Sequence, residues 1–170
     1  MSESTAEHRE AAEGRRAVCA VLTISDTRTK ETDKGGRIIM DELEAAGHRV
    51  NAYEIVKDET EQIDGQLKEW LATHGFDLII ATGGTGISSR DTTVEVVERL
   101  LDKKLEGFGE LFRMLSWEEV GPAAMLSRAV GGLAGETLIF VLPGSRHAVK
   151  LAMSKLLVPE LPHLIWERGR

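Results

Sequence analysis

Residues 81–93 read ATGGTGISSRDTT, a stretch in which three glycines fall within four positions and an acidic residue follows. Glycine permits positive φ angles and lets a ligand contact the backbone closely. Successive N–H groups in such a turn can form a concave anion-binding site, and a helix beginning near residue 91 or 92 adds its positive dipole end. The stretch is neither a Walker A sequence nor a G-x-G-x-x-G fingerprint. It predicts a phosphate-binding loop made of Thr82, Gly83, Gly84, Thr85 and Gly86; a tight strand-to-helix turn without a ligand is the alternative.

Two acidic residues are candidates for a cation site beside these glycines. Asp91 follows the glycine loop, and Asp58 follows an apolar stretch that is typical of a strand. Mg²⁺ takes oxygen ligands and commonly accompanies phosphates. Each residue also has an ordinary structural interpretation: Asp91 is suited to cap a helix, and Asp58 is a common type of loop residue. Their position near a predicted phosphate site favours the functional interpretation of both.

The elements that must position these residues follow an alternating pattern. Apolar runs predict strands at 17–26, 77–82 and 136–144, and RVNAYEIV (49–56) is predicted as a further strand. Helical spacing of apolar residues predicts helices at 37–47, 60–74, 92–103 and around 108–115, and a last helical segment after residue 145 that is interrupted near Pro159 and Pro162. A short helix and a strand-like AVGGL are expected after Pro122. Strands that alternate with helices indicate an α/β fold, with a mostly parallel sheet and helices on both faces.

In such sheets ligands bind at the carboxyl ends of the strands. Four segments follow the predicted strands, and they share one edge if the strands are parallel: Ser25-Asp26-Thr27, Lys57-Asp58-Glu59, residues 82–86 and Pro143-Gly144-Ser145. The last segment is either a plain turn or a second backbone cradle that leads into a helix N-terminus. Arg128 is suited to bind a phosphate or a carboxylate, and a surface ion pair is its alternative.

Composition excludes several classes of function. The 170 residues suit one domain, here 17–170, behind a polar and flexible tail at 1–16. The net charge of −7 argues against nonspecific nucleic-acid binding, which a basic excess drives. No apolar run is long enough to span a membrane and no signal-peptide core is present, so a cytoplasmic protein is expected. The single cysteine, Cys19, is expected to be a buried thiol in a strand.

Several separated motifs resemble one known family. LTISDTRTKETDKGG, TGGTGISSRDTT, AMLSRAVGGLAGETLI and LPGS are similar to segments of the MoaB/MogA family of molybdenum-cofactor biosynthesis proteins, the first of them to the MoaB branch. The resemblance spans residues 17–165 in the correct order. It implies a three-layer α/β/α fold whose mixed sheet has one antiparallel strand. It also implies a homotrimer or a homohexamer.

The resemblance implies a ligand and a reaction. The family binds molybdopterin, and its adenylyltransferase members use Mg²⁺ and ATP to place AMP on the molybdopterin phosphate. A separate enzyme then uses the product for molybdenum insertion. The two essential acids of the family correspond to Asp58 and Asp91, its glycine loop to Gly83, Gly84 and Gly86, and its pterin-side serine to Ser127. Some MoaB-branch members lack the acid at the position of Asp91, which this chain retains.

This chain departs from the family pattern at two places. Thr92-Thr93 stands where many members have Val-Thr, and Arg146 stands where many have a second proline after the Pro-Gly-Ser segment. The second departure changes the phosphate contacts expected of that loop, although Arg146 supplies a positive charge.

We therefore expect a molybdopterin adenylyltransferase. Asp91 is expected to bind Mg²⁺ directly or through water, and Asp58 to orient the nucleophile or a metal-bound water. Ser25 and Asp26 are expected to line the same edge, and Ser127 to contact the pterin. A non-catalytic molybdopterin-binding or assembly protein is the main alternative, and a generic Mg²⁺-nucleotide phosphotransferase is a third hypothesis.

Overall fold

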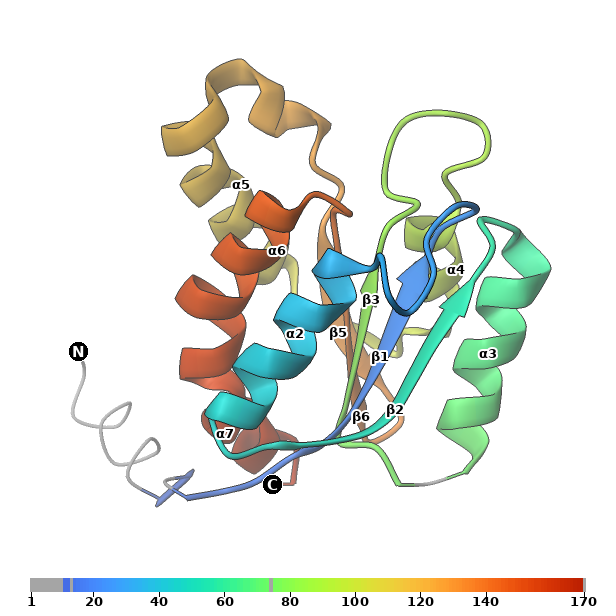
Figure 1. Ribbon diagram of the computed structural model, residues 1–170. Helices are drawn as coiled ribbons and strands as arrows, with labels where there is room; N and C mark the ends of the chain where they lie inside the picture. The colour runs from blue at the N-terminus through green and yellow to red at the C-terminus, as the bar shows by residue number, and fades with distance from the viewer. Residues whose placement is uncertain (1–10, 13, 74, 170) are drawn as a thin grey trace.

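A six-stranded sheet lies between two layers of helices in this computed structural model (Figure 1), which describes residues 11–12, 14–73 and 75–169. The strands are β1 (Val18–Ile24), β2 (Arg49–Val56), β3 (Leu78–Thr82), β4 (Lys103–Lys104), β5 (Val130–Ala134) and β6 (Thr137–Leu142). The helices are α2 (Lys34–Ala45), α3 (Thr60–Ala72), α4 (Thr93–Leu100), α5 (Glu106–Val120), the 3₁₀-helix η1 (Gly121–Leu126), α6 (Arg146–Ala152), the π-helix η2 (Met153–Leu157) and α7 (Val158–Arg168). Most of the tail predicted at residues 1–16 lies outside the described residues.

The strands are arranged in the order β2-β1-β3-β6-β5-β4. β1 pairs in parallel with β2 and β3, and β3 pairs in parallel with β6. β5 is antiparallel to both of its neighbours, β6 and β4, so it runs against the other five strands. The mostly parallel, mixed sheet with one antiparallel strand is therefore confirmed.

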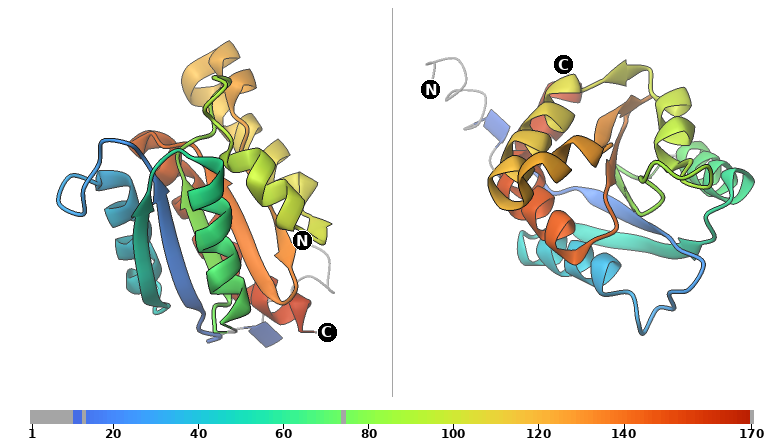
Figure 2. Two further views of the ribbon diagram at one scale, coloured as in Figure 1. Left: turned by 90° about the vertical axis from the view of Figure 1, so that its right-hand side faces the viewer. Right: turned by 90° about the horizontal axis from the view of Figure 1, so that it is seen from above.

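The central strands are buried on both faces, and each face supports its own core. In β1, Cys19 and Val21 face the core that α2, α5, α6 and α7 cover, while Ala20 and Leu22 face the core that α3 and α4 cover. Figure 2 shows these two helical layers on opposite sides of the sheet. The Cys19 thiol is buried as expected, and burial together with the charge of Asp77 raises its pKa to about 12. Such a thiol is inert at neutral pH.

The elements differ from the sequence-based expectations at three places. α2 begins at Lys34 rather than near residue 37, because Asp33 caps it by accepting a hydrogen bond from the Gly36 N–H. The two-residue strand β4, which no sequence pattern predicted, adds an edge to the sheet. The last helical segment is not interrupted at its prolines: α6, η2 and α7 follow one another without a break, and the π-helix ends at Leu157, two residues before Pro159. Proline cannot donate a backbone hydrogen bond, and the wider helical turn before it accommodates this missing donor.

The carboxyl ends of β1, β2, β3 and β6 all reach one edge of the sheet, which lies at the top of Figure 1. The loop between β3 and α4 stands out from this edge. Among the described residues, no helix combines the length and the apolar character needed to cross a membrane.

Candidate functional site

The four segments that follow the parallel strands meet at the carboxyl edge, as the sequence predicted. The Thr82 hydroxyl donates to the Pro143 carbonyl at 3.2 Å, and the Gly83 N–H donates to the Leu142 carbonyl at 3.1 Å. The Asp58 N–H donates to the Asp26 carboxylate at 3.2 Å. These hydrogen bonds join β3 to β6, and the loop after β1 to the loop after β2, where the loops begin.

The glycine loop adopts a backbone that side chains would obstruct. Gly83 and Gly84 have φ angles of 105° and 60°, in the region that favours glycine. A Cβ at Gly83 would lie 2.3 Å from the Ile24 carbonyl oxygen. A Cβ at Gly86 would lie 2.7 Å from the Asp91 carboxylate, so the third glycine leaves room for the acid. In the described residues, the N–H groups of residues 84–86 donate to no protein acceptor, which leaves them available to an anion.

Asp91 belongs to this loop and does not cap the helix. The N-cap of α4 is Thr92, and its side chain makes no capping hydrogen bond. The Asp91 carboxylate instead accepts the Ser88 N–H at 3.0 Å. The capping alternative for Asp91 is therefore wrong, and its carboxylate lies next to Gly86.

Three carboxylates, those of Asp26, Asp58 and Asp91, surround the loop. The Asp58 Oδ1 atom is buried and has no hydrogen-bond partner among the described residues. Burial, followed by the charges of Asp91 and Asp26, raises the Asp58 pKa, and the positive charge of Arg90 partly offsets this effect. A buried carboxylate oxygen without a partner is costly, and a cation would relieve both the burial and the repulsion.

These carboxylates fit a magnesium ion that arrives with a phosphate ligand. Among the described residues, no three His, Cys, Asp or Glu side chains form a ready-made metal cage. Mg²⁺ rarely needs one, because it keeps several waters and is bound through one or two carboxylates together with substrate phosphates. The unpartnered oxygen of Asp58 and the adjacent Asp91 are the residues that would hold it.

Arg128 joins the glycine loop to the backbone of Asp91. Its guanidinium donates to the Thr85 carbonyl at 3.0 Å and to the Asp91 carbonyl at 2.9 Å, and it also pairs with Glu95. The ion pair lowers the pKa of Glu95. A planar guanidinium can serve several acceptors at once, so Arg128 positions the loop that carries Asp91.

A cavity of about 270 Å³ opens beside the loop, between α5, η1 and α6. Thr85, Gly86 and Ser127 contribute to its wall, together with Pro143 and Ser145. The Ser127 hydroxyl oxygen is buried and has no hydrogen-bond partner among the described residues. A buried hydroxyl without a partner at the wall of a mostly apolar cavity indicates a place where a ligand provides the missing contact.

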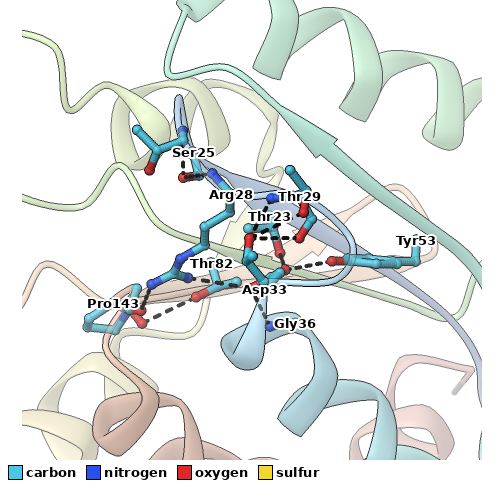
Figure 3. A network of polar contacts seen from close by, with 12 residues as sticks. Thr23, Ser25, Arg28, Thr29, Asp33, Gly36, Tyr53, Thr82 and Pro143 are labelled. Atoms are coloured by element: carbon cyan, nitrogen blue, oxygen red, sulfur yellow. Dashed lines mark hydrogen bonds and ion pairs between the residues drawn. The ribbon is translucent and has the colours of Figure 1, made fainter.

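The structure also shows a network of polar contacts that the sequence analysis missed (Figure 3). The buried Asp33 carboxylate accepts hydrogen bonds from the hydroxyls of Thr23 at 2.6 Å and Tyr53 at 2.7 Å. Arg28 lies 3.4 Å from the same carboxylate and donates to the Gly144 carbonyl at 3.1 Å. The network therefore joins the loop after β1 to the Pro143-Gly144-Ser145 segment.

The pKa of Asp33 reflects this network. Burial raises it, but the hydrogen bonds from Thr23, the Gly36 N–H and Tyr53, and the charge of Arg28, together hold it below its ordinary value. Asp33 lies directly before a helix with an apolar stripe, which is the position of an N-cap. That signal could have identified it in the sequence.

Two larger hollows, of about 740 Å³ each, lie away from these residues. One is lined by Asp77 and Arg168 near the amino ends of the strands, and the other lies between α5 and α7. Neither contains the glycine loop or the unpartnered carboxylate. The chemistry available at the carboxyl edge therefore decides the location of the site.

Fold and site together define an α/β protein with a backbone anion cradle, an acidic cluster and an adjoining apolar cavity. A family model described as "Probable molybdopterin binding domain" matches residues 20–163. The chain is 58% identical to molybdenum cofactor biosynthesis protein B of Staphylococcus carnosus (strain TM300) over 152 residues, which cover 88% of this chain and 89% of that protein.

Solved structures agree with this match. A crystal structure of molybdenum cofactor biosynthesis protein B has a TM-score of 0.89 and 50% identity, covering 92% of this chain and 98% of that chain. The tungsten cofactor synthesizing protein MoaB from Pyrococcus furiosus has a TM-score of 0.82 and 36% identity, covering 92% and 99%. The chain belongs to the MoaB/MogA family of molybdopterin-binding proteins of molybdenum-cofactor biosynthesis.

Proposed function

We propose that this protein transfers the adenylyl group of ATP to the phosphate of molybdopterin, with Mg²⁺ as the cofactor. The observation that carries the proposal is the buried oxygen of Asp58 that has no hydrogen-bond partner among the described residues. Burial and two neighbouring carboxylates raise the pKa of Asp58. This oxygen lies beside a backbone cradle whose N–H groups are free for an anion. Acidic groups next to a phosphate cradle favour chemistry on a nucleotide that carries a cation, and a protein that only stores a pterin has no need of them.

The reaction is an attack of a molybdopterin phosphate oxygen on the α-phosphorus of ATP. The new P–O bond forms as the bond between the α-phosphorus and its bridging oxygen breaks, and diphosphate leaves with that bond's electrons. Because the attacking phosphate is already ionised, no strong general base is required. Positioning and charge neutralisation supply most of the catalysis in such transfers.

The chain's own groups divide this work. The N–H groups of residues 84–86 hold phosphate oxygens, and Arg128 keeps that backbone in place. Asp58 and Asp91 hold Mg²⁺, which when bound neutralises the charge of the phosphates. Ser25 and Asp26 line the same edge, where the Asp26 carboxylate accepts the Asp58 N–H. The pterin ring lies in the cavity beside Ser127.

A matched set of variants tests the proposal. Asp58→Asn and Asp91→Asn are each expected to reduce formation of adenylylated pterin by roughly 100-fold or more, because each removes a carboxylate that holds the cation. Pterin binding and the unfolding midpoint are expected to stay near those of the wild type. The control is Asp41→Asn, which changes an exposed acid on α2 and is expected to retain activity.

Wild-type turnover in either variant would remove the role assigned to that aspartate. Wild-type protein that binds molybdopterin and forms no product, beside an active related enzyme, would instead identify a non-catalytic binding or assembly protein of the same pathway.

We also propose that the chain forms a homotrimer or homohexamer and passes its product to a separate molybdenum-insertion enzyme. Both points rest on the family resemblance. Large apolar side chains are exposed on α5 and η1, where they offer a face for association: Leu111, Met114, Trp117, Val120, Met125 and Leu126. Sedimentation velocity distinguishes a monomer from either assembly.

A further inference from the structure

The cavity beside Ser127 contains a second polar feature that the transfer reaction does not use. Among the described residues that line it, Glu119 of α5 and His147 of α6 are the charged or titratable groups, and the remaining wall is apolar or carries small polar side chains. Phe112, Ala124 and Leu151 are among the apolar residues. A flat ring with a polar edge suits such a wall, because the faces contact carbon while the edge reaches the charged group.

Glu119 has the chemistry to receive a pair of N–H donors. Its Oε2 atom lies 2.5 Å from His147 Nε2, and 33% of its side chain is exposed. An ionised carboxylate only accepts hydrogen bonds, and its two oxygens match two adjacent donors on one side of a planar group. Because 72% of the His147 side chain is exposed, it can turn toward water when a ligand reaches the carboxylate.

We propose that Glu119 recognises the 2-amino and N3–H edge of the pterin ring, and so selects a 2-amino-4-oxopyrimidine. The assignment rests on the proposed function for the presence of a pterin. The cavity wall includes Thr85 and Gly86, so a ligand whose phosphate lies in the glycine loop can place its ring here. Ser127 then offers its unpartnered hydroxyl to a second polar atom of the same ligand.

Guanine has the same edge as a pterin, so two kinds of ligand could bind Glu119 in this way. A pterin and a guanine nucleotide both present an amino group next to a ring N–H. The cavity volume of about 270 Å³ accommodates either ring. The experiment must therefore separate the two ligands as well as test Glu119.

The test compares three ligands: pterin, lumazine and GMP. Lumazine replaces the 2-amino group with an oxygen, which would face the carboxylate and be repelled. Dissociation constants are measured with the full chain, by fluorescence for the two pteridines and by competition for GMP. Wild-type protein is expected to bind pterin at least roughly tenfold more tightly than lumazine or GMP, since a site built around N–H donors rejects a ligand that lacks them.

Variants assign the selectivity to Glu119. Glu119→Gln is expected to bring the pterin-to-lumazine ratio close to one, whereas Glu118→Gln, the matched control on the same helix, retains the wild-type ratio. His147→Ala is expected to bind pterin at least as tightly as the wild type, because a competitor for the carboxylate is gone. The ratio between two ligands is a readout that a purely structural role of Glu119 would not change.

An unchanged ratio in Glu119→Gln overturns the assignment, as does wild-type protein that binds neither pteridine. Tighter binding of GMP than of pterin overturns the choice of ring. The two proposals fail separately: adenylyl transfer with an unchanged ratio removes only the role of Glu119, and selective pterin binding through Glu119 without transfer removes only the reaction.

Discussion

The three glycines of the glycine loop are required for different structural reasons. Gly83 and Gly84 have positive φ angles, and a side chain on Gly83 would collide with the backbone of Ile24. Gly86 lacks a positive φ, and the atom nearest to its missing Cβ is the Asp91 carboxylate oxygen. The first two glycines therefore set the fold of the loop, and the third protects the position of the acid.

This distinction predicts that one alanine substitution mainly lowers stability and the other mainly lowers activity. Gly83→Ala is expected to lower the free energy of unfolding by roughly 3 kcal/mol, because the strained backbone and the carbonyl contact cannot relax. Gly86→Ala is expected to cost less than about 1 kcal/mol but to reduce adenylyl transfer roughly 100-fold, because it displaces the Asp91 side chain. Urea unfolding and product formation measured on both variants check the prediction. Equal losses of stability in the two would contradict it.

Single residues show where sequence reasoning succeeded and where it stopped. Asp58 and Asp91 could be located because Asp58 follows one predicted strand and Asp91 follows the glycine loop after another, and parallel strands place such segments on one edge. Asp33 was recognisable only as an N-cap before a helix. Its partners Thr23 and Tyr53 could not be predicted, because these hydrogen bonds join β1, the following loop and β2 across 10 to 20 positions of sequence. Buried polar side chains within apolar strands give no sequence pattern that identifies their partners.

The loop between β1 and α2 is held by the Asp33 carboxylate, which gives it a testable electrostatic signature. Asp33→Asn is expected to destabilise the protein by about 2 kcal/mol at pH 7, since two buried hydroxyls donate to one oxygen and an amide nitrogen cannot accept from either. The structure holds the pKa of Asp33 below its ordinary value. The stabilisation is therefore complete above the unfolded pKa of about 3.9 and is lost as pH falls through the folded value.

Urea unfolding at pH 7 and at pH 3 measures this effect. The difference between wild type and Asp33→Asn is expected to shrink at the lower pH, with Asp41→Asn as a control that shows little difference at either. A difference that stays constant with pH would show that the charge of Asp33 does not stabilise the loop.

Most elements were predictable because each has one strong local signal. The buried strands are apolar and rich in β-branched residues, and the helices carry an apolar stripe. β4 escaped prediction because it consists of two exposed lysines that pair only through their backbone with β5. The helical continuity at Pro159 depends on a π-turn, and a proline ordinarily indicates an interruption instead.

For the molecule as a whole, stability between neutral and mildly acidic pH is expected to depend on the buried His48. His48 accepts the Ala17 N–H at 3.1 Å, and burial lowers its pKa below the ordinary value. The unfolded chain therefore takes up a proton at a higher pH than the folded chain. The contribution of His48 to stability is complete above a pH of about 6.5 and is lost as pH falls through the folded pKa.

His48→Gln is expected to flatten the decline in stability between pH 7.5 and pH 5.5, because glutamine does not titrate. Urea unfolding at several values of pH in this range gives the slope for both proteins. Parallel slopes would show that the native state does not discriminate against the protonated imidazole.

The central proposal for the whole molecule is adenylyl transfer at the carboxyl edge of the sheet, and labelled ATP tests it most directly. Wild-type protein is incubated with molybdopterin, Mg²⁺ and ATP labelled with ³²P at either the α- or the γ-phosphorus. The proposed transfer predicts that the α-label enters the pterin product and that the γ-label leaves as diphosphate. A γ-label in the product would indicate a phosphotransferase, and no label in the product from either ATP would contradict nucleotide transfer altogether.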